Sequence, residues 1–428
     1  MPGKGIFIFI NFTGFKVARI EQTETPADLE VRVKKMSRPT KFDKVVRREI
    51  CQITTLGTKI NGSRENSYLT AICGQKSLSE EGKIVIGLCF LDTSMGLVHL
   101  SQFLDDKELS CLETLLAFYP PVEILVDRKT SSIFTDFLGK FSYVNKRLMN
   151  FPDASKTLKN LHDYYGGGKN EWPGEISNVH LDESDNLGLS AKKSSEQALA
   201  AFGAIINYLS ESMIDSHILN QKQIKNIDPP LDIKAKVQDE ILAKNMILDN
   251  KTLKNLDIIP NLDHPEVASL FSVIDNTLTN FGKRLLRQWL CMPLLKIQDI
   301  QERQEILKHF ENSLETVQVL KNELKGIPDL EKLVSSIHAS GIKLPEDHPE
   351  QRAIYYEQAT YASRKVSKLL MTLDALDKLQ DLFKSKLPSD ESIFTKSIVE
   401  DFPDVSKELD FFKVIIFKSS YVDIVVGG

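Results

Sequence analysis

The sequence predicts a multidomain chain in which an α/β domain is followed by a mostly helical, all-α domain. Between residues 49 and 226, apolar runs typical of buried strands alternate with amphipathic helices, and this order predicts a mixed sheet covered by helices. After the Asp228-Pro229-Pro230 break, apolar residues recur at three- and four-residue spacing, which indicates long packed helices. The chain has 428 residues, enough for two or three domains with a core each.

The first predicted elements are a strand at residues 15–20 and a helix that follows it closely. Thr25 is a suitable N-cap and Pro26 suits the first helical position. Asp28 stands where its carboxylate can meet the free amides at the helix N-terminus. These residues predict a strand-to-helix corner, and the corner by itself carries no chemistry.

A basic run follows the corner and is the one local electrostatic signal in the sequence. Asp43 is the only acidic residue among its eight cations, which are Arg32, Lys34, Lys35, Arg38, Lys41, Lys44, Arg47 and Arg48. Such density suits contacts to DNA phosphates. A solvated linker is an equal alternative, because we see no pattern of aromatic residues interleaved with the charges. The residues that we expect nearest to DNA are Lys34, Lys35, Arg38, Lys41, Arg47 and Arg48.

The α/β domain is expected to open with a hairpin and a helix. Residues 83–90 and 97–103 are strand-like runs joined by a turn at 92–96. Asp105 or Asp106 then caps a helix with leucines along one face. Strand, strand and helix in this order are the opening of a sheet with helices packed on it.

The later elements of this domain are a third strand and an amphipathic helix. Pro120 and Pro121 end the preceding helix, and residues 122–126 predict the strand. Ser194 and Gln197 are expected to form a capping box at the start of the helix.

In the all-α domain, apolar stripes indicate core packing. The stripe positions are Ile300, Leu307, Phe310, Leu314, Val317 and Leu324, and then Val366, Leu369, Leu373, Leu376 and Phe383. In the helix near residue 289, the residues expected to anchor the core are Leu285, Leu286, Trp289 and Leu290. The neighbouring Lys283, Arg284 and Arg287 are expected to be solvated, and phosphate binding by these cations is the alternative.

Composition and missing motifs limit the possible functions. The net charge of −5 gives no global argument for nucleic acid, and the five cysteines contain no Cys-x-x-Cys pair. Gly168-Lys169 is followed by Asn170, so the chain has no P-loop there, and its eight histidines form no zinc motif. The apolar run at 6–10 is too short to span a bilayer and lacks a cleavage site, so we expect neither targeting nor membrane contact.

Several segments, in one order from Gly14 to about Leu409, resemble the MutS family of DNA repair proteins. The corner, which reads Gly-Phe-Lys-Val-Ala-Arg-Ile-Glu-Gln-Thr-Glu-Thr-Pro, is most similar to the branch of MutS homologue 6. The segments that carry the resemblance are 14–26, 46–50, 119–122, 153–158, 248–256, 274–279, 282–290 with Pro293, 328–333 and 352–355. Several motifs in register are more specific than any one of them.

The resemblance implies an RNase H-like connector domain followed by a helical lever domain. The implied bounds are an unassigned extension at 1–13, the C-terminal remnant of the mismatch-binding domain at 14–48, the connector at 49–226, the first lever segment at 227–412, and an unassigned end at 413–428. The family's Phe-x-Glu wedge would precede Gly14, and its clamp and ATPase would follow the lever. We therefore expect a partial chain.

The resemblance also implies the function of the complete protein. The resemblance to the MutS homologue 6 branch implies a protein that binds mismatched double-stranded DNA as a heterodimer with a second MutS homologue. It also implies coupling to ATP and Mg²⁺, contact with downstream repair factors, and a nuclear location. For this chain we expect no catalytic residue, no metal, no bound ATP and no other cofactor.

Two alternatives come from other functional classes. An RNase H-like sheet can hold carboxylates for a metal-dependent nuclease, and Asp92, Glu123 and Asp127 stand at or near predicted strand ends. The simpler interpretation is that these residues make turns and strand ends. The other alternative is a scaffold that binds proteins and has no role with DNA.

Overall fold

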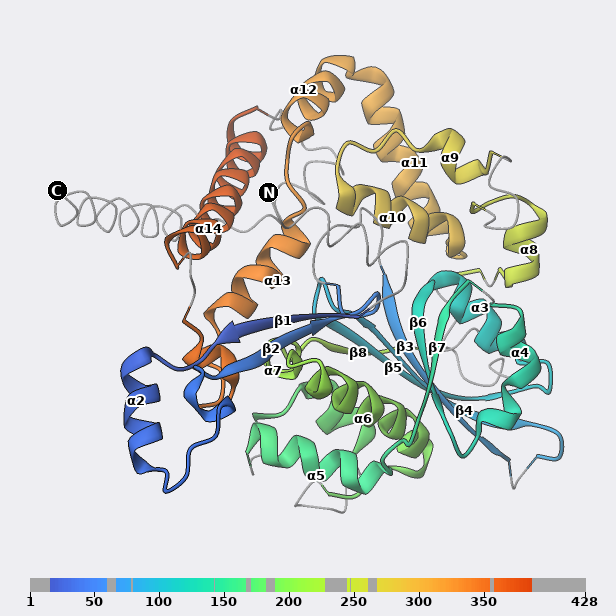
Figure 1. Cartoon of the computed structure of the whole chain (residues 1–428). Coiled ribbons are helices and arrows are strands. Elements are labelled where there is room, and N and C mark those ends of the chain that lie inside the picture. The colour runs from blue at the N-terminus through green and yellow to red at the C-terminus, as the bar shows by residue number, and fades with distance from the viewer. Residues whose placement is uncertain are drawn as a thin grey trace. The chain divides into compact units, whose positions relative to one another are not determined.

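The computed structural model describes residues 16–59, 67–77, 80–141, 143–166, 171–181, 189–227, 245–246, 248–260, 268–354 and 358–386. The predicted end segments 1–13 and 413–428 lie outside these residues. The chain divides into two compact units (Figure 1). The first unit contains Met1–Ala235, Asp249–Thr252 and Ser335–Ser363, and the second contains Lys236–Leu248, Leu253–Val334 and Arg364–Gly428.

Within the described part of the first unit, six strands form a mixed sheet in the order β7-β6-β3-β4-β5-β8 (Figure 1). The strands are β3 (Tyr68–Lys76), β4 (Ile84–Asp92), β5 (Leu97–Asp105), β6 (Pro121–Asp127), β7 (Asn145–Met149) and β8 (Ile224–Asn226). β4 runs antiparallel to β3 and β5, whereas β6, β7 and β8 each pair in parallel with a neighbour. This arrangement confirms the predicted α/β architecture and the hairpin of β4 and β5.

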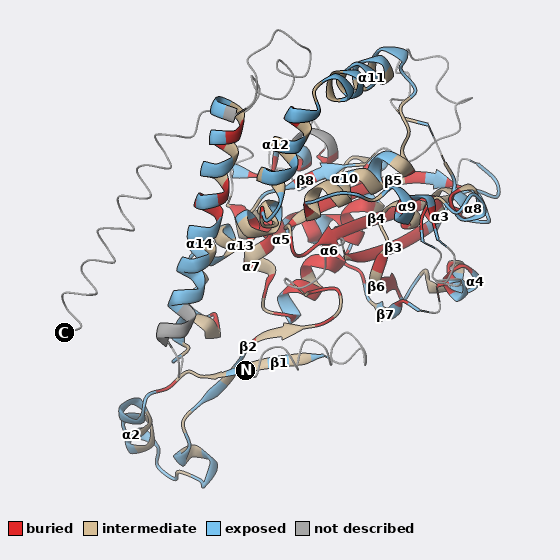
Figure 2. Cartoon of the chain, turned by 90° about the horizontal axis from the view of Figure 1, so that it is seen from above, coloured by how far each residue is buried: buried red, intermediate tan, exposed pale blue. Residues whose placement is uncertain are grey.

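Helices cover both faces of the sheet, so its central strands are buried on two sides. α5 (Ala154–Tyr165) and α6 (Glu196–Glu211) lie on one face, and α3 (Ser110–Phe118) and α4 (Thr135–Gly139) lie on the other (Figure 1). Successive side chains of a strand point to opposite faces. In β3, Leu69 and Ala71 therefore join the core under α6, whereas Tyr68 and Ile72 join the core under α3. Figure 2 shows the buried residues concentrated in this sheet and in α6.

Capping residues confirm one prediction about helix starts and correct another. At α3, both candidates act: the Asp105 carboxylate accepts hydrogen bonds from the amides of Cys111 and Leu112, and Asp106 accepts one from Ser110. At α6, the expected capping box is wrong, because the N-cap residue makes no side-chain cap.

A residue from the sheet caps α6 instead. The Gln102 side-chain oxygen, on β5, accepts hydrogen bonds from the amides of Gln197 and Ala198 at 2.7 and 3.2 Å. A tertiary contact therefore satisfies the helix amides that the sequence assigned to a local cap.

The described residues of the second unit are predominantly helical, which confirms the predicted all-α domain. Its helices are α9 (Leu270–Ile274), α10 (Asn280–Cys291), α11 (Ile297–Asn312) and α12 (Leu314–Leu324). The helices α8 (Asn250–Asn255), α13 (Leu330–Gly341) and α14 (Gln358–Asp381) each contain residues of both units. Among the described residues, no helix is long and apolar enough to cross a membrane.

The core of the second unit follows the expected apolar stripes only in part. Leu382 is fully buried and packs with Ile306, Phe310, Val319, Leu320, Leu379 and Phe383. However, Leu307, Leu314 and Val366 are exposed, so the packing prediction is wrong for these three residues. For Leu314 the reason is a break at Ser313, whose non-helical backbone separates α11 from α12 and restarts the helical period. In α11, Ile306 and Phe310 face the core in place of Leu307.

Candidate nucleic-acid interface

The basic run lies on a projecting connection between two strands of the first unit. β1 (Val17–Gln22) pairs antiparallel with β2 (Arg48–Thr54), and α2 (Pro26–Lys35) and the 3₁₀ turn η1 (Phe42–Lys44) connect them. Figure 2 shows α2 and its flanks extending away from the six-stranded sheet. The predicted cap is confirmed: the Thr25 hydroxyl accepts from the Asp28 amide at 3.1 Å, and the Asp28 carboxylate accepts from the Thr25 amide at 3.2 Å.

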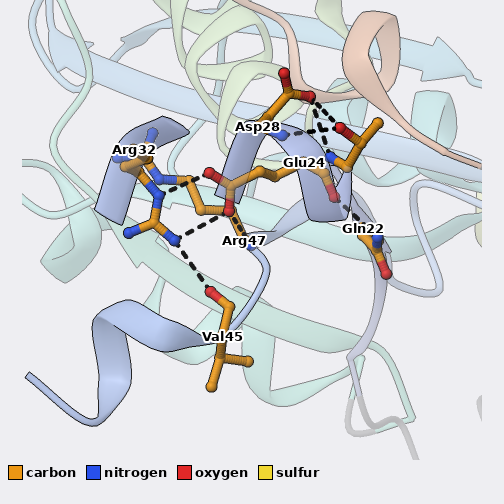
Figure 3. Close-up of polar contacts among 7 residues, drawn as sticks. Gln22, Glu24, Asp28, Arg32, Val45 and Arg47 are labelled. Carbon is orange, nitrogen blue, oxygen red and sulfur yellow. Dashed lines mark hydrogen bonds and ion pairs between the residues drawn. The ribbon is translucent and has the colours of Figure 1, made fainter. Parts of the chain in front are cut away.

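A nearly buried carboxylate fixes the base of this connection (Figure 3). Glu24, only 7% exposed, accepts hydrogen bonds from Arg32 Nε at 2.7 Å and Nη2 at 3.0 Å, and from the Arg47 amide at 3.0 Å. Arg32 also donates to the carbonyl of Val45 at 3.1 Å. The hydrogen bond from Arg32 holds the pKa of Glu24 below its ordinary value. One cation of the run is therefore used to join α2 to the start of β2.

The acidic residue within the run also makes internal contacts. The Asp43 carboxylate accepts from the Thr40 hydroxyl at 2.5 Å and from the Thr40 amide at 2.8 Å. These hydrogen bonds lower the pKa of Asp43. Asp43 therefore closes the turn that precedes it.

The remaining cations of the run are all exposed, and we call them the basic surface. They are Lys34, Lys35, Arg38, Lys41, Lys44, Arg47 and Arg48. Lys34 comes within 4.0 Å of Glu30, but both side chains are largely solvated, and such pairs are weak. The structure thus brings the six predicted DNA-proximal residues together on one connection, and their proximity to DNA stays a prediction.

The structure adds an aromatic residue that the sequence interpretation overlooked. Phe42 lies within the basic surface, between Lys41 and Lys44, and is 87% exposed. One ring does not make a repeating aromatic pattern, but its exposure was not considered in the sequence interpretation. The signal was present in the sequence as Lys41-Phe42-Asp43-Lys44.

The β1–β2 ribbon is fastened to a later segment of the same unit. Arg19 forms an ion pair with Glu350, and Arg352 forms one with Glu49 at 2.8 Å. The Ile354 amide donates to the carbonyl of Gln22 at 2.8 Å, which continues the hydrogen bonding along the edge of β1. These contacts hold in place the ribbon from which the basic surface projects.

The carboxylates considered for a metal-dependent nuclease have structural partners instead. Asp92 accepts from the Ser94 amide and hydroxyl, and so closes the hairpin turn. Asp127 accepts from the Phe151 amide at 3.3 Å. The described residues contain no group of acidic, histidine or cysteine side chains arranged to hold a metal ion. Within the described ranges, therefore, no observation supports the nuclease alternative.

The third carboxylate, Glu123, joins three elements of the first unit. It accepts hydrogen bonds from the Thr55 hydroxyl at 2.8 Å, the Gly57 amide at 3.2 Å and the Tyr208 hydroxyl at 2.6 Å. Thr55 and Gly57 follow β2, Glu123 is on β6, and Tyr208 is on α6. This network links the end of the ribbon to the core of the sheet domain.

Helix α10 corrects the packing predicted around residue 289. Leu285 and Trp289 are 47% and 44% exposed, and Leu286 and Leu290 are only half-buried. The Arg303 guanidinium lies 3.8 Å from the centre of the Trp289 ring, an exposed cation–π contact. Leu285 and Trp289 share one helix face, and no described residue covers it well enough to bury them.

The anchor of α10 is instead Arg284, whose side chain is 9% exposed. It donates two hydrogen bonds to Asp329 at 2.7 and 2.8 Å, and it also pairs with Glu331. Burial alone would lower the pKa of Arg284, but the hydrogen bonds to these carboxylates raise it overall. The expectation of a solvated cation was therefore wrong at Arg284, and Lys283 also pairs with Asp275 at 3.1 Å.

Comparisons with known proteins agree with this architecture. The family model for MutS domain II matches residues 67–221, and that for MutS domain III matches residues 251–414. The DNA mismatch repair protein Msh6 of Gallus gallus is 35% identical over 92% of this chain and 32% of its own length. Msh6 of Homo sapiens is 35% identical over 93% of this chain, and MSH6 of Saccharomyces cerevisiae is 26% identical over 78%.

An α/β domain followed by a helical domain, matched in order by the two domain models, defines a MutS-type multidomain protein. The chain belongs to the MutS family of DNA mismatch repair proteins, and within that family it is similar to Msh6. It spans about a third of the length of these relatives, which are covered to 32% in the two vertebrate cases.

Proposed function

We propose that this chain acts in DNA mismatch repair as the connector and lever part of an Msh6-like protein, and that its basic surface contacts DNA phosphates. One observation carries the proposal: the cations of the basic surface are exposed, whereas the nearby Glu24, Asp28 and Asp43 are occupied in internal hydrogen bonds. The chain as a whole has a net charge of −5, so this positive surface is a local feature and not a result of overall composition.

Contacts to phosphates position a protein on DNA without reading its sequence. Lysine and arginine side chains at exposed positions can neutralise phosphates and release counterions. Binding by this surface should therefore be weak, strongly dependent on salt, and the same for matched and mismatched duplexes.

The properties of the complete protein belong to the same proposal. Relatives named as DNA mismatch repair proteins support mismatched double-stranded DNA as the substrate. We propose a second MutS homologue as partner subunit, contact with downstream repair factors, and a nuclear location. ATP and Mg²⁺ would be bound outside the connector and lever. The proposed bounds are 14–48 for the end of the mismatch-binding domain, 49–226 for the connector and 227–412 for the lever.

Titration of a fluorescent duplex, with and without a mismatched base pair, at several salt concentrations tests the proposal. A variant with Lys34, Lys35, Arg38, Arg47 and Arg48 changed to Ala should lose most of the affinity. The slope of log affinity against log salt concentration should also become shallower, by roughly one for each phosphate contact removed.

The matched control removes the same charge elsewhere on the first unit. Its changed residues are the exposed Lys107, Lys129, Lys146, Lys156 and Lys159, each replaced by Ala. This control should keep the affinity of the unaltered chain. Equal losses in the two variants would contradict the basic surface as the contact site. Preference of the unaltered chain for a duplex whose mismatched bases remain stacked in the helix would contradict phosphate contact as the basis of duplex binding.

A further inference from the structure

We infer that Phe42 is a base-stacking residue, so that the basic surface favours DNA with an unstacked base over fully paired duplex. The inference rests on the proposed DNA contact and names the form of DNA that this surface takes. The feature behind it is one highly exposed aromatic ring among cations, on a connection where Glu24 and Asp43 are occupied in internal hydrogen bonds.

The exposure of Phe42 is unusual within the described chain. Its 87% exposed fraction is the largest of any large apolar side chain that the structure describes. Phenylalanine is usually found inside proteins, because burial of its ring away from water is favourable. Val31 and Val45, in the same connection, are 52% and 49% exposed, so Phe42 differs from them in being aromatic and in being far more exposed.

The backbone that carries Phe42 is constrained on both sides. Before it, Asp43 holds the Thr40 amide and hydroxyl, which fixes the turn into η1. After it, Arg32 holds the Val45 carbonyl and is itself held by Glu24 (Figure 3). A ring on a constrained turn loses little conformational freedom when it meets a ligand, and pre-organisation of this kind favours binding.

The chemistry of the neighbours points to a nucleotide. Proteins that bind single strands combine aromatic rings, on which bases stack, with cations that follow the backbone phosphates. Lys41 and Lys44 flank the ring, and Lys34, Lys35 and Arg38 lie in the same connection. A fully paired duplex offers these cations its phosphates but keeps the faces of its bases stacked inside. A single strand, or a duplex with an extrahelical base, exposes both its phosphates and the face of an unstacked base.

The experiment compares three probes by fluorescence anisotropy at one salt concentration. The probes are a short oligo(dT) strand, a fully paired duplex, and the same duplex with one unpaired thymine. Phe42→Ala should weaken oligo(dT) binding by about 5- to 150-fold, the range expected for one lost base stack, and should leave the paired duplex unchanged. Val31→Ala, which removes exposed apolar surface from the same connection, is the matched control and should change none of the three.

A second variant gives a direct reading of the contact. Phe42→Trp should retain the affinity for oligo(dT). It should also add a fluorescence signal, above that of the unaltered chain, which is quenched by oligo(dT) and by the unpaired thymine but not by the paired duplex. Circular dichroism of each variant confirms that the fold is retained.

The outcomes separate this inference from the proposed function. Loss of binding in the five-alanine variant, with no effect of Phe42→Ala on any probe, would overturn the inference and leave the phosphate contact standing. Absence of salt-dependent binding to all three probes would overturn both. Tighter binding of an acidic peptide that contains phenylalanine than of oligo(dT) would overturn the inference in favour of a protein ligand.

Discussion

The buried hydroxyl of Tyr208 provides the most exacting test of how the ribbon is joined to the sheet domain. Tyr208 is 1% exposed, and its hydroxyl donates to the Glu123 carboxylate at 2.6 Å. Burial, together with the negative charge of Glu123, raises the pKa of Tyr208, so the hydroxyl stays protonated and remains a donor at ordinary pH. Tyr208→Phe removes one oxygen atom and leaves a buried carboxylate with fewer donors.

The magnitude follows from the kind of acceptor. A hydrogen bond to a charged group contributes about 1.5–3 kcal/mol, so Tyr208→Phe should lower the free energy of unfolding by that amount. Tyr165→Phe is the matched control in the same core, because the Tyr165 hydroxyl donates at 2.7 Å to a neutral acceptor, the Leu219 carbonyl. A neutral pair contributes about 0.5–1.5 kcal/mol, so the control should be the milder change.

Equilibrium urea unfolding, followed by circular dichroism, measures both variants. Hydrogen exchange of the Gly57 amide, which donates to the same carboxylate, reports whether the loss reaches the segment after β2. A double-mutant cycle with Glu123→Gln should give a coupling energy of about 1 kcal/mol or more. If Tyr165→Phe proved as costly as Tyr208→Phe, or if the cycle gave no coupling, the charged network would not be what joins these elements.

Three further predictions concern other parts of the chain. Arg284→Ala should destabilise the second unit by about 2–3 kcal/mol, because it leaves two carboxylates without their partner. Trp289→Ala should destabilise it by only about 1–2 kcal/mol, because Trp289 is 44% exposed. Urea unfolding compares the two variants. Gly87→Ala places a Cβ 2.2 Å from a backbone oxygen of α6, so this variant should lose about 1–3 kcal/mol or more of stability. At Gly139 an added Cβ meets no atom within 4 Å, so Gly139→Ala should stabilise the chain by up to about 1 kcal/mol. Thermal unfolding compares the two variants. Because the pKa of Glu24 is lowered in the folded chain, its contribution to stability is complete above the ordinary glutamate pKa and is lost as the pH falls through the lower folded value. The rate of amide hydrogen exchange in β1 and β2 should therefore rise over that acidic range. Glu24→Gln should remove this pH dependence.

Local and periodic signals made most of the fold predictable. The Thr25 cap depends on residues within one helical turn, and the β4–β5 hairpin depends on two apolar runs separated by a turn, so both could be predicted from neighbouring residues. The cap of α6 could not, because Gln102 lies 95 positions before the amide that it accepts from. The same limit applies to Arg284, whose partner Asp329 is 45 positions away.

Helix α10 shows why an apolar stripe alone was an insufficient guide. Spacing established that Leu285 and Trp289 share a face, and the structure agrees. Spacing does not establish that another element covers that face, and the exposure of both side chains shows that the described chain covers it only in part. A charged residue on another face, Arg284, became the anchor, because the carboxylates of Asp329, just before α13, and Glu331, in its first turn, meet it there.

The basic run illustrates the corresponding limit for charge. Counting along the sequence sets eight cations against Asp43, but it cannot say which charges remain available. Glu24, which lies outside the run, takes up Arg32, whereas Asp43, inside it, is turned to Thr40. A linker that is merely solvated needs no such arrangement, because water hydrates exposed carboxylates and exposed cations equally well. The occupation of Glu24 and Asp43 in internal contacts, with seven cations and Phe42 exposed beside them, therefore favours a binding surface over a linker.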